Sequence, residues 1–337
     1  MAKGRVLVTG GTGYIAGFII KQLIEQDWLV NTTIRSLAKE VRLRETLGVD
    51  DDRLTVFAAD LTSDEGWAEA TAGCDFVQHI ASPLPAGVPK SEDDLIVPAR
   101  EGALRALRFA KQAGVKRVVM TSSMAAIAYG VGRGVHHFDE SNWTDLSHPD
   151  CYPYVKSKTI AERAARDWIE QEGAGLEYVS INPGLVLGPQ MSDDFSSSLE
   201  SVKKLMDGSF PAAPDLGFAV VDVRDTADLH IRAMTAPDMH GERFIAAGQF
   251  MKLHDIAMVL RDRLGDKAKK VPKAKLPDFI MKIIALFDPV ARSVVSELGK
   301  VRHVDASHAK KRLGWKTRPV EDSIVDTAND LIARGIV

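Results

Sequence analysis

A tyrosine and a lysine four residues apart could together perform acid–base chemistry. Tyr154 and Lys158 lie at the start of a segment with helical periodicity, about residues 155–171, so their side chains share one helix face. A phenol is a weak acid with a pKa of about 10, and a nearby ammonium lowers that pKa. The pair could therefore give a proton to a carbonyl oxygen as a hydride reaches the carbon, or remove it in reverse.

The same segment contains a second pair with this spacing, Tyr152 and Lys156. Pro153 favours the later pair, because proline is tolerated in the first turn of a helix but not in its interior. Tyr152 should then lie before the helix. Taken alone, a tyrosine and a lysine at this spacing usually form only a surface pair, so a catalytic assignment needs further groups nearby.

A hydroxyl cluster, Thr121, Ser122 and Ser123, follows an apolar strand and supplies such groups. Ligands of open α/β sheets bind outside the carboxyl ends of the strands. A serine at this point could hydrogen-bond the substrate oxygen and stabilise its developing charge. The alternative is that the serines only form a turn or cap a helix.

A glycine-rich turn near the N-terminus predicts a nucleotide site. Residues 6–8 form an apolar strand, the turn GGTG occupies 10–13, and a helical pattern begins at Ile15. Gly10 allows a tight turn, Gly13 allows the backbone to approach a pyrophosphate, and Ala16 replaces the third glycine of the fingerprint. The N-terminus of the helix supplies free N–H groups. A plain turn between strand and helix is the alternative, but the surrounding strand and helix are those that the motif requires.

The end of the second strand indicates which dinucleotide is bound. Residues 28–34 form that strand, Arg35 follows it, and the first acid comes only at Glu40. An acid here would bind a ribose 2′-hydroxyl, whereas an arginine accommodates a 2′-phosphate. Lys39 or Arg42 could add positive charge. The residues therefore favour NADP(H) over NAD(H), although Arg35 could also belong to a solvated basic helix start.

Strands and helices alternate through the first half of the chain. Further strands are predicted at 54–58, 75–80, 117–121 and 176–182, and helices at 38–47, 64–72 and 93–112. This alternation predicts an α/β fold with a doubly wound, Rossmann-type parallel sheet.

Beyond Pro183 the pattern is interrupted by prolines and glycines. We predict an NADP-binding core over 1–182, to which a strand and helix at 217–236 return. A smaller, mainly helical substrate-binding part is expected over 183–216 and 237–337.

Composition narrows the class of protein. The chain has 337 residues, 45% hydrophobic and 26% charged, with a formal net charge of −3, which gives no electrostatic case for nucleic-acid binding. Its two cysteines form neither a metal-binding pattern nor a disulfide framework, and a reducing cytoplasm is expected. No signal peptide, membrane span or metal site is predicted. The oligomeric state and the physiological substrate stay open.

Several motifs, taken in order, resemble the extended short-chain dehydrogenase/reductases, within them the branch of dihydroflavonol 4-reductase, cinnamoyl-CoA reductase and microbial aldehyde and ketone reductases. The motifs lie at residues 10–16 (GGTGYIA), 60–61 (DL), 121–123 (TSS), 139–143 (DESNW), 154–158 (YVKSK), 182–184 (NPG) and 186–189 (VLGP).

The resemblance implies that Ser123, Tyr154 and Lys158 are the catalytic residues, with Lys158 also holding the nicotinamide ribose. It implies that Asp60 and Leu61 flank the adenine. The residues expected to contact the cofactor are Gly10, Thr12, Gly13, Tyr14, Ile15, Arg35, Lys39, Asp60, Leu61, Ala81, Ser82, Thr121, Tyr154, Lys158 and Pro183.

One departure bears on the substrate. The plant flavonoid reductases of this family carry a flavonoid-binding asparagine five residues after the catalytic serine, where this chain has Ala128. A general aldehyde or ketone is therefore expected rather than a flavonoid.

Other residues have simpler expected roles. His136 and His137 are expected in an exposed glycine-rich loop, and His79 in the core. Residues 124–126 should lie either beside the substrate or in a buried turn, and residues 222–228 should form a structural charge network.

The leading hypothesis is an NADPH-dependent carbonyl reductase that acts on a small-molecule substrate, with Tyr154 as the proton donor. A nucleotide-sugar epimerase or dehydratase with bound NAD would share the fold and catalytic residues, but Arg35 argues against it. A non-enzymatic NADP(H) sensor is the third alternative, and the intact pair of Tyr154 and Lys158 argues against it.

Overall fold

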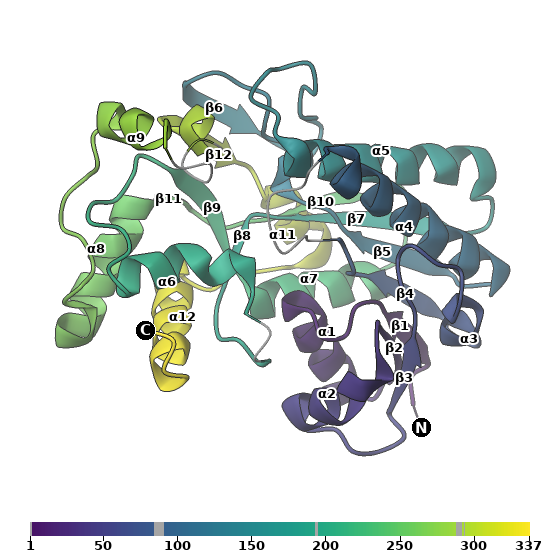
Figure 1. Ribbon diagram of the computed structural model, residues 1–337. Coiled ribbons are helices and arrows are strands. Elements are labelled where there is room, and N and C mark those ends of the chain that lie inside the picture. The colour runs from purple at the N-terminus through teal and green to yellow at the C-terminus, as the bar shows by residue number, and fades with distance from the viewer. Residues whose placement is uncertain (1, 84–90, 193–194, 288–291, 293) are drawn as a thin grey trace.

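A seven-stranded parallel sheet forms the centre of the molecule (Figure 1). The computed structural model describes residues 2–83, 91–192, 195–287, 292 and 294–337. In spatial order, the strands of this sheet are β10 (Arg243–Ala246), β7 (Glu177–Pro183), β5 (Arg117–Thr121), β4 (Phe76–His79), β1 (Arg5–Val8), β2 (Leu29–Ile34) and β3 (Leu54–Ala58).

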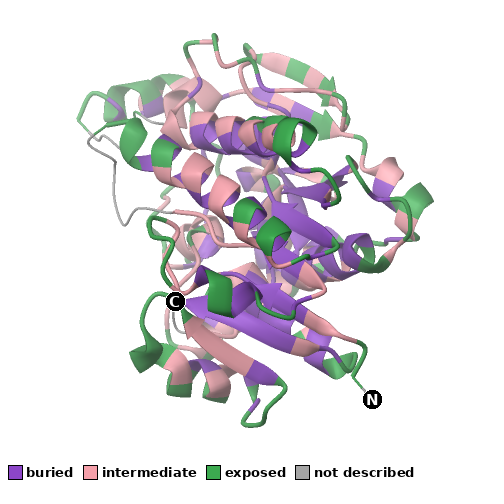
Figure 2. Ribbon diagram, turned by 90° about the vertical axis from the view of Figure 1, so that its right-hand side faces the viewer, coloured by how far each residue is buried: buried purple, intermediate pink, exposed green. Residues whose placement is uncertain are grey.

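Both faces of this sheet are covered by helices, so its central strands β1 and β5 are largely buried and apolar, whereas the edge strand β3 is mostly half-buried (Figure 2). Successive residues of β1 point to opposite faces. Val6 and Val8 pack in the hydrophobic core with helices α1 (Tyr14–Glu25) and α7 (Val223–Thr235). Leu7 packs in the core on the other face. That core lies against the helices α4 (Asp93–Gln112) and α5 (Pro153–Glu172), which contact each other along their lengths.

The doubly wound sheet predicted from the alternating pattern is confirmed. The chain runs from β1 outward through β2 and β3, and then crosses to β4 on the other side of β1. Parallel sheets form a ligand crevice at such a switch point, outside the carboxyl ends of the strands. The helices that complete the layers are α2 (Glu40–Leu47), α3 (Trp67–Thr71) and α11 (Ser307–Leu313).

A smaller part packs beside the carboxyl edge of the sheet around its own hydrophobic core (Figure 1). Its strands form two small sheets, which consist of β11 (Phe250–Lys252), β9 (Gly217–Asp222) and β8 (Leu185–Leu187), and of β12 (Lys300–Val304) and β6 (Gly134–Phe138). Its helices are α6 (Glu200–Met206), α8 (Leu253–Leu264), α9 (Asp278–Ile284) and α12 (Val320–Ala333). The short 3-10 helices of the chain are η1 (Leu37–Lys39), η2 (Met124–Ala126), η3 (Ser197–Leu199), η4 (Gly265–Ala268) and η5 (Val295–Glu297).

The structure differs from the sequence-based expectations in three places, two in the division between the parts and one in secondary structure. Within 217–236, only α7 returns to the main sheet, because β9 pairs with β8 and β11. Conversely, β10 lies beyond residue 236 but pairs with β7 in the main sheet. The loop expected around His136 and His137 is strand β6, which pairs in parallel with β12. These pairings join segments distant in sequence, so local patterns do not reveal them.

Among the described residues, none of the helices has the length and apolar character needed to cross a membrane.

A buried histidine, His230, connects helix α7 to the main sheet through hydrogen bonds. His230 Nδ1 lies 2.8 Å from Gln78 Oε1, and its Nε2 lies 3.0 Å from Thr121 Oγ1. Burial lowers the pKa of His230 to about 3, so this histidine stays neutral in the folded protein at ordinary pH.

This depressed pKa predicts a loss of stability in acid. Below pH about 6.5 the unfolded chain binds a proton at His230 that the folded protein does not accept until about pH 3. In that window His230 should reduce the free energy of unfolding by about 1.4 kcal/mol for each pH unit. Urea unfolding between pH 7 and 4 should show a correspondingly shallower pH dependence in His230→Gln. The exposed His240 provides a matched control, because His240→Gln should keep the wild-type slope.

Candidate active site

The glycine turn after β1 has the backbone conformation that the fingerprint predicts. Gly10 adopts a φ of +72°, and a Cβ there would lie 3.1 Å from that of Ala81. A Cβ on Gly11 would lie 2.3 Å from Thr32 Oγ1, a close approach that the sequence analysis did not assign. The N–H of Gly13 donates to the carbonyl of Gly10 over 2.8 Å, and Gly13 is the N-cap of α1. The turn thus exposes backbone where side chains would collide, which suits it to hold a pyrophosphate.

A cavity of about 190 Å³ opens between this turn and helix α2. Its lining residues are Gly11, Thr12, Gly13, Tyr14, Gly17, Ala38, Lys39, Arg42, Leu43, Thr46, Leu47, Met191 and Ser192. Lys39 and Arg42, both considered as phosphate-binding residues, lie here. Arg35 is exposed after β2, outside this lining but close enough to Asp60 for its charge to contribute to the lowered pKa of that carboxyl, after the larger effect of hydrogen bonds from Thr62.

The side chain of Thr9, at the carboxyl end of β1, holds the turn after β4 in place. Its Oγ1 accepts hydrogen bonds from the N–H groups of Ile80 and Ala81, each over 3.0 Å, and lies 3.1 Å from His79 Nδ1. His79 is the buried core histidine that was expected, and burial lowers its pKa to about 3. Sequence reasoning missed Thr9, although a threonine at the strand end directly before Gly10 was a visible signal.

The predicted catalytic residues lie together. Ser123 lies close enough to Tyr154 for its hydroxyl to lower the pKa of the Tyr154 phenol. Lys158 Nζ lies 6.0 Å from the centroid of the Tyr154 ring and donates to Ser82 Oγ over 3.0 Å. Ser123 Oγ also accepts from the N–H of Ala125 over 3.1 Å, which fixes its side chain at the start of η2.

The pKa of Tyr154 shifts in the direction opposite to the expected one. Burial raises it, and the hydroxyl of Ser123 offsets this only in part. The expected lowering by the ammonium of Lys158 is not among the causes of the shift, which the desolvation of the buried phenol dominates. Burial lowers the pKa of Lys158 to about 8, and the negative charge of Glu162 counteracts that change.

The structure separates the competing pair, as Pro153 predicted. Helix α5 starts at Pro153, so Tyr152 lies before the helix, as its N-cap. Lys156 points to a different partner, because its Nζ lies 2.8 Å from both carboxylate oxygens of Glu92. Only Tyr154 and Lys158 share one side of α5 with Ser123.

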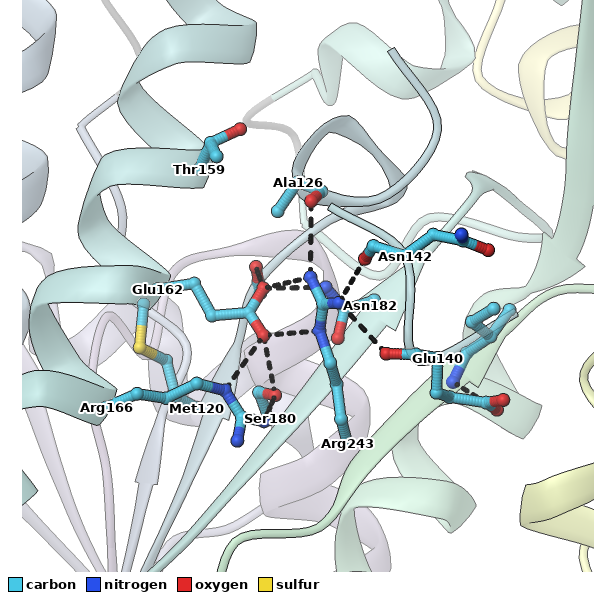
Figure 3. A network of polar contacts seen from close by, with 12 residues as sticks. Met120, Ala126, Glu140, Asn142, Thr159, Glu162, Arg166, Ser180, Asn182 and Arg243 are labelled. Atoms are coloured by element: carbon cyan, nitrogen blue, oxygen red, sulfur yellow. Dashed lines mark hydrogen bonds and ion pairs between the residues drawn. The ribbon is translucent and has the colours of Figure 1, made fainter. Parts of the chain in front are cut away.

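A buried ion pair lies one helical turn beyond Lys158 (Figure 3). Arg243 of β10 donates through Nε to Glu162 Oε1 over 2.7 Å, and both side chains are almost completely excluded from solvent. Burial alone would raise the pKa of Glu162, but the charges of Arg243 and Arg166 and the hydrogen bond from Ser122 hold it below its usual value. Ser180 Oγ also donates to this carboxylate, over 2.9 Å.

This ion pair is connected to Ser123 through Asn182. The Nδ2 of Asn182 donates to Glu162 Oε2 over 2.8 Å (Figure 3). It also donates to the backbone carbonyl of Ser123 over 3.0 Å. Arg243 donates further hydrogen bonds to the backbone carbonyls of Ala126 and Glu140, over 3.2 and 3.0 Å. Sequence reasoning did not assign Glu162 or Arg243, and noted Asn182 only as part of a family motif.

A second cavity, also about 190 Å³, lies beyond Ser123 and Tyr154. Its lining residues are Ser123, Met124, Ala125, Ala128, Tyr129, Tyr152, Tyr154, Pro183, Gly184, Leu185, Ser198, Gly217, Phe218, Ala219, Phe250, Arg302 and Val304. Residues 124–126, weighed as substrate neighbours or as part of a buried turn, form η2; Met124 and Ala125 also line the cavity, and Ala126 does not. His136 and His137 are not among the lining residues.

The expected charge network at 222–228 is present. Arg224 Nη2 lies 2.7 Å from Asp222 Oδ2 and 2.6 Å from Asp326 Oδ2. Ser323 Oγ donates to Asp222 Oδ2 over 2.8 Å. These contacts join the start of α7 to α12, so the network connects the main sheet to the smaller part.

Comparison with known proteins agrees with this geometry. The NAD dependent epimerase/dehydratase family matches residues 6–247. Cinnamoyl-CoA reductase 2 of Arabidopsis thaliana is 32% identical over 335 residues, covering 98% of this chain and 93% of the relative. Dihydroflavonol 4-reductase of Hordeum vulgare is 31% identical over 272 residues, covering 77% of this chain and 75% of the relative.

Among solved structures, the yeast methylglyoxal/isovaleraldehyde reductase Gre2 complexed with NADPH aligns with a TM-score of 0.81 and 27% identity, over 99% of this chain and 100% of that chain. The glycine turn, the adjacent hydroxyls of Ser123 and Tyr154, and these similarities lead to one assignment. The chain belongs to the NAD-dependent epimerase/dehydratase family and is an oxidoreductase of the extended short-chain dehydrogenase/reductase type.

Proposed function

We propose that this protein reduces an aldehyde or a ketone to an alcohol with NADPH. The observation that carries the proposal is that Ser123 and Tyr154 lie next to each other in the wall of the second cavity, with Lys158 Nζ 6.0 Å from the centroid of the Tyr154 ring. Two hydroxyls placed in this way can hold one carbonyl oxygen. The names of the reductases described above support the same reaction type.

The first cavity suits the cofactor. Gly11 and Gly13 leave room that a side chain would fill, and Lys39 and Arg42 bring positive charge to the cavity beside α2. Arg35 would add its charge at the ribose end of the crevice, where a 2′-phosphate needs cations. Lys158 and Ser82 would hold the nicotinamide ribose, and Pro183 would border the nicotinamide. Bound NADPH supplies the hydride.

The residues of the protein position the substrate carbonyl and supply a proton. Ser123 and Tyr154 donate hydrogen bonds to the carbonyl oxygen, and Tyr154 transfers its proton to that oxygen as the carbon receives the hydride. The products are the alcohol and NADP⁺, and the phenolate regains a proton from solvent. Lys158, whose pKa burial lowers to about 8, is mostly charged at neutral pH and stabilises the transient phenolate.

Removal of the phenol hydroxyl tests this role directly. Tyr154→Phe should lower kcat by at least about a hundredfold while leaving NADPH affinity almost unchanged, because the hydroxyl acts mainly in the transition state. Steady-state NADPH oxidation and fluorescence titration of NADPH measure the two quantities. Tyr152→Phe should lose far less activity, and the reverse order of the two variants would refute the assignment.

The cofactor preference depends on positive charge at Arg35. Arg35→Asp should weaken NADPH binding and shift the ratio of kcat/KM values toward NADH, because a carboxylate repels the 2′-phosphate and can accept a hydrogen bond from a 2′-hydroxyl. Arg53→Asp, at an exposed arginine just before β3, controls for the change in net charge. Equal use of both cofactors by the wild-type protein would contradict the proposal.

The fully buried Ala128 predicts the class of substrate. It stands where a flavonoid reductase would need a polar group, and a site rejects the wrong ligand strongly when its buried polar groups are left unpaired. We therefore expect kcat/KM to be higher for a simple aryl aldehyde than for a dihydroflavonol. Parallel kinetics on the two compounds measure this, and a clear preference for the dihydroflavonol would overturn it.

A further inference from the structure

The second cavity contains a pair of phenols beside the predicted proton donor. Tyr129 follows η2, and Tyr152 immediately precedes α5. The ring of Tyr152 stacks on that of Tyr154, with centroids 6.5 Å apart and planes inclined by 17°. The ring of Tyr129 meets Tyr152 edge-on, with centroids 6.1 Å apart. The three rings therefore form one continuous wall of the cavity.

The two phenols can offer one proton to a ligand. Both residues line the cavity, and among the described residues neither hydroxyl has a hydrogen bond to the backbone or to a side chain outside the pair. Burial raises the pKa of both Tyr129 and Tyr152, so both keep their protons. Each phenol carries one proton, so even when one hydroxyl donates to the other, the second proton is left for a ligand.

The surroundings of Tyr129 hold this pair in place. The guanidinium of Arg302 lies 4.2 Å from the centroid of the Tyr129 ring, and its Nε donates to the carbonyl of Ala128 over 2.8 Å. The backbone N–H of Tyr129 donates to Thr144 Oγ1 over 3.0 Å. A polar group fixed in this way binds a ligand with little loss of conformational freedom.

The charges near the two phenols favour an uncharged hydrogen-bond acceptor on the substrate. Arg302 is paired with the carboxylate of Glu297, so its positive charge is already compensated. A carboxylate or phosphate on the substrate would therefore gain little from Arg302. A neutral ether, hydroxyl or carbonyl oxygen needs only one donor, which is what the phenol pair can supply.

We propose that Tyr129 and Tyr152 form a polar subsite that binds a second, uncharged oxygen of the substrate, close to the carbonyl held by Ser123 and Tyr154. This inference rests on the proposed function and narrows its substrate class to oxygen-bearing aldehydes and ketones. The subsite compensates for the polar group that is missing at Ala128, but with a single available donor it favours one extra oxygen rather than a polyhydroxylated ligand.

Two isosteric ketones test the subsite. Phenoxyacetone and 4-phenyl-2-butanone differ by an ether oxygen in place of a methylene, so the ratio of their kcat/KM values reports binding of that oxygen. Intrinsic reactivity also differs between the two, but it cancels when variants are compared. The double variant Tyr129→Phe/Tyr152→Phe keeps both rings and removes both hydroxyls. Its ratio should fall about fivefold to tenfold below that of the wild type.

Each single variant keeps one phenol and should give an intermediate ratio. Tyr178→Phe is the matched control, because it removes a buried phenol hydroxyl outside the cavity, one that contacts Met120 Sδ at 3.3 Å. Its ratio should equal that of the wild type. Thermal unfolding checks that all variants fold.

A second measurement does not depend on turnover. The two product alcohols, 1-phenoxy-2-propanol and 4-phenyl-2-butanol, are titrated into each variant in the presence of NADP⁺, and the ratio of their Kd values should change in the same way. An unchanged ratio in the double variant, or no binding of either alcohol to the wild type, would overturn the subsite. Failure of the proposed function would differ, since no carbonyl compound would then support NADPH oxidation.

Discussion

The ion pair between Glu162 and Arg243 is the contact on which the arrangement of the active site depends. A carboxylate excluded from water is costly unless it is paired and hydrogen-bonded. Glu162 meets this requirement with Arg243, Ser122, Ser180 and Asn182, so helix α5 and strands β5, β7 and β10 must converge on one point (Figure 3). Loss of Arg243 would leave Glu162 with only the more distant charge of Arg166, and loss of Glu162 would leave the buried Arg243 with backbone carbonyls as its partners.

The same ion pair also acts on Lys158 and Ser123, two residues that we propose to be catalytic. Lys158 lies one turn before Glu162 on α5, and the negative charge of Glu162 opposes the fall in the pKa of Lys158 that burial causes. Asn182 connects Glu162 to the backbone of Ser123. One buried carboxylate is therefore linked to both residues, to Lys158 through its charge and to Ser123 through Asn182.

The second cavity is made by segments that lie far apart in the sequence. Strand β12 brings Arg302 to the ring of Tyr129 and to the carbonyl of Ala128, and pairs with β6. Phe250 of β11 and Phe218 of β9 close another side. These strands belong to the smaller part, whereas Ser123 and Tyr154 lie in the part built around the main sheet, so the cavity lies at the boundary between the two.

Features that depend on a few neighbouring residues could be predicted from the sequence. These are the conformation of Gly10, the alternation of strands and helices, and the start of α5 at Pro153, which follow from backbone geometry and periodicity. The pairing of β6 with β12, the partner of Glu162 and the direction of the pKa shift of Tyr154 became visible only in the folded chain. Each of these depends on which residues from distant parts of the sequence lie side by side, and no local pattern records that.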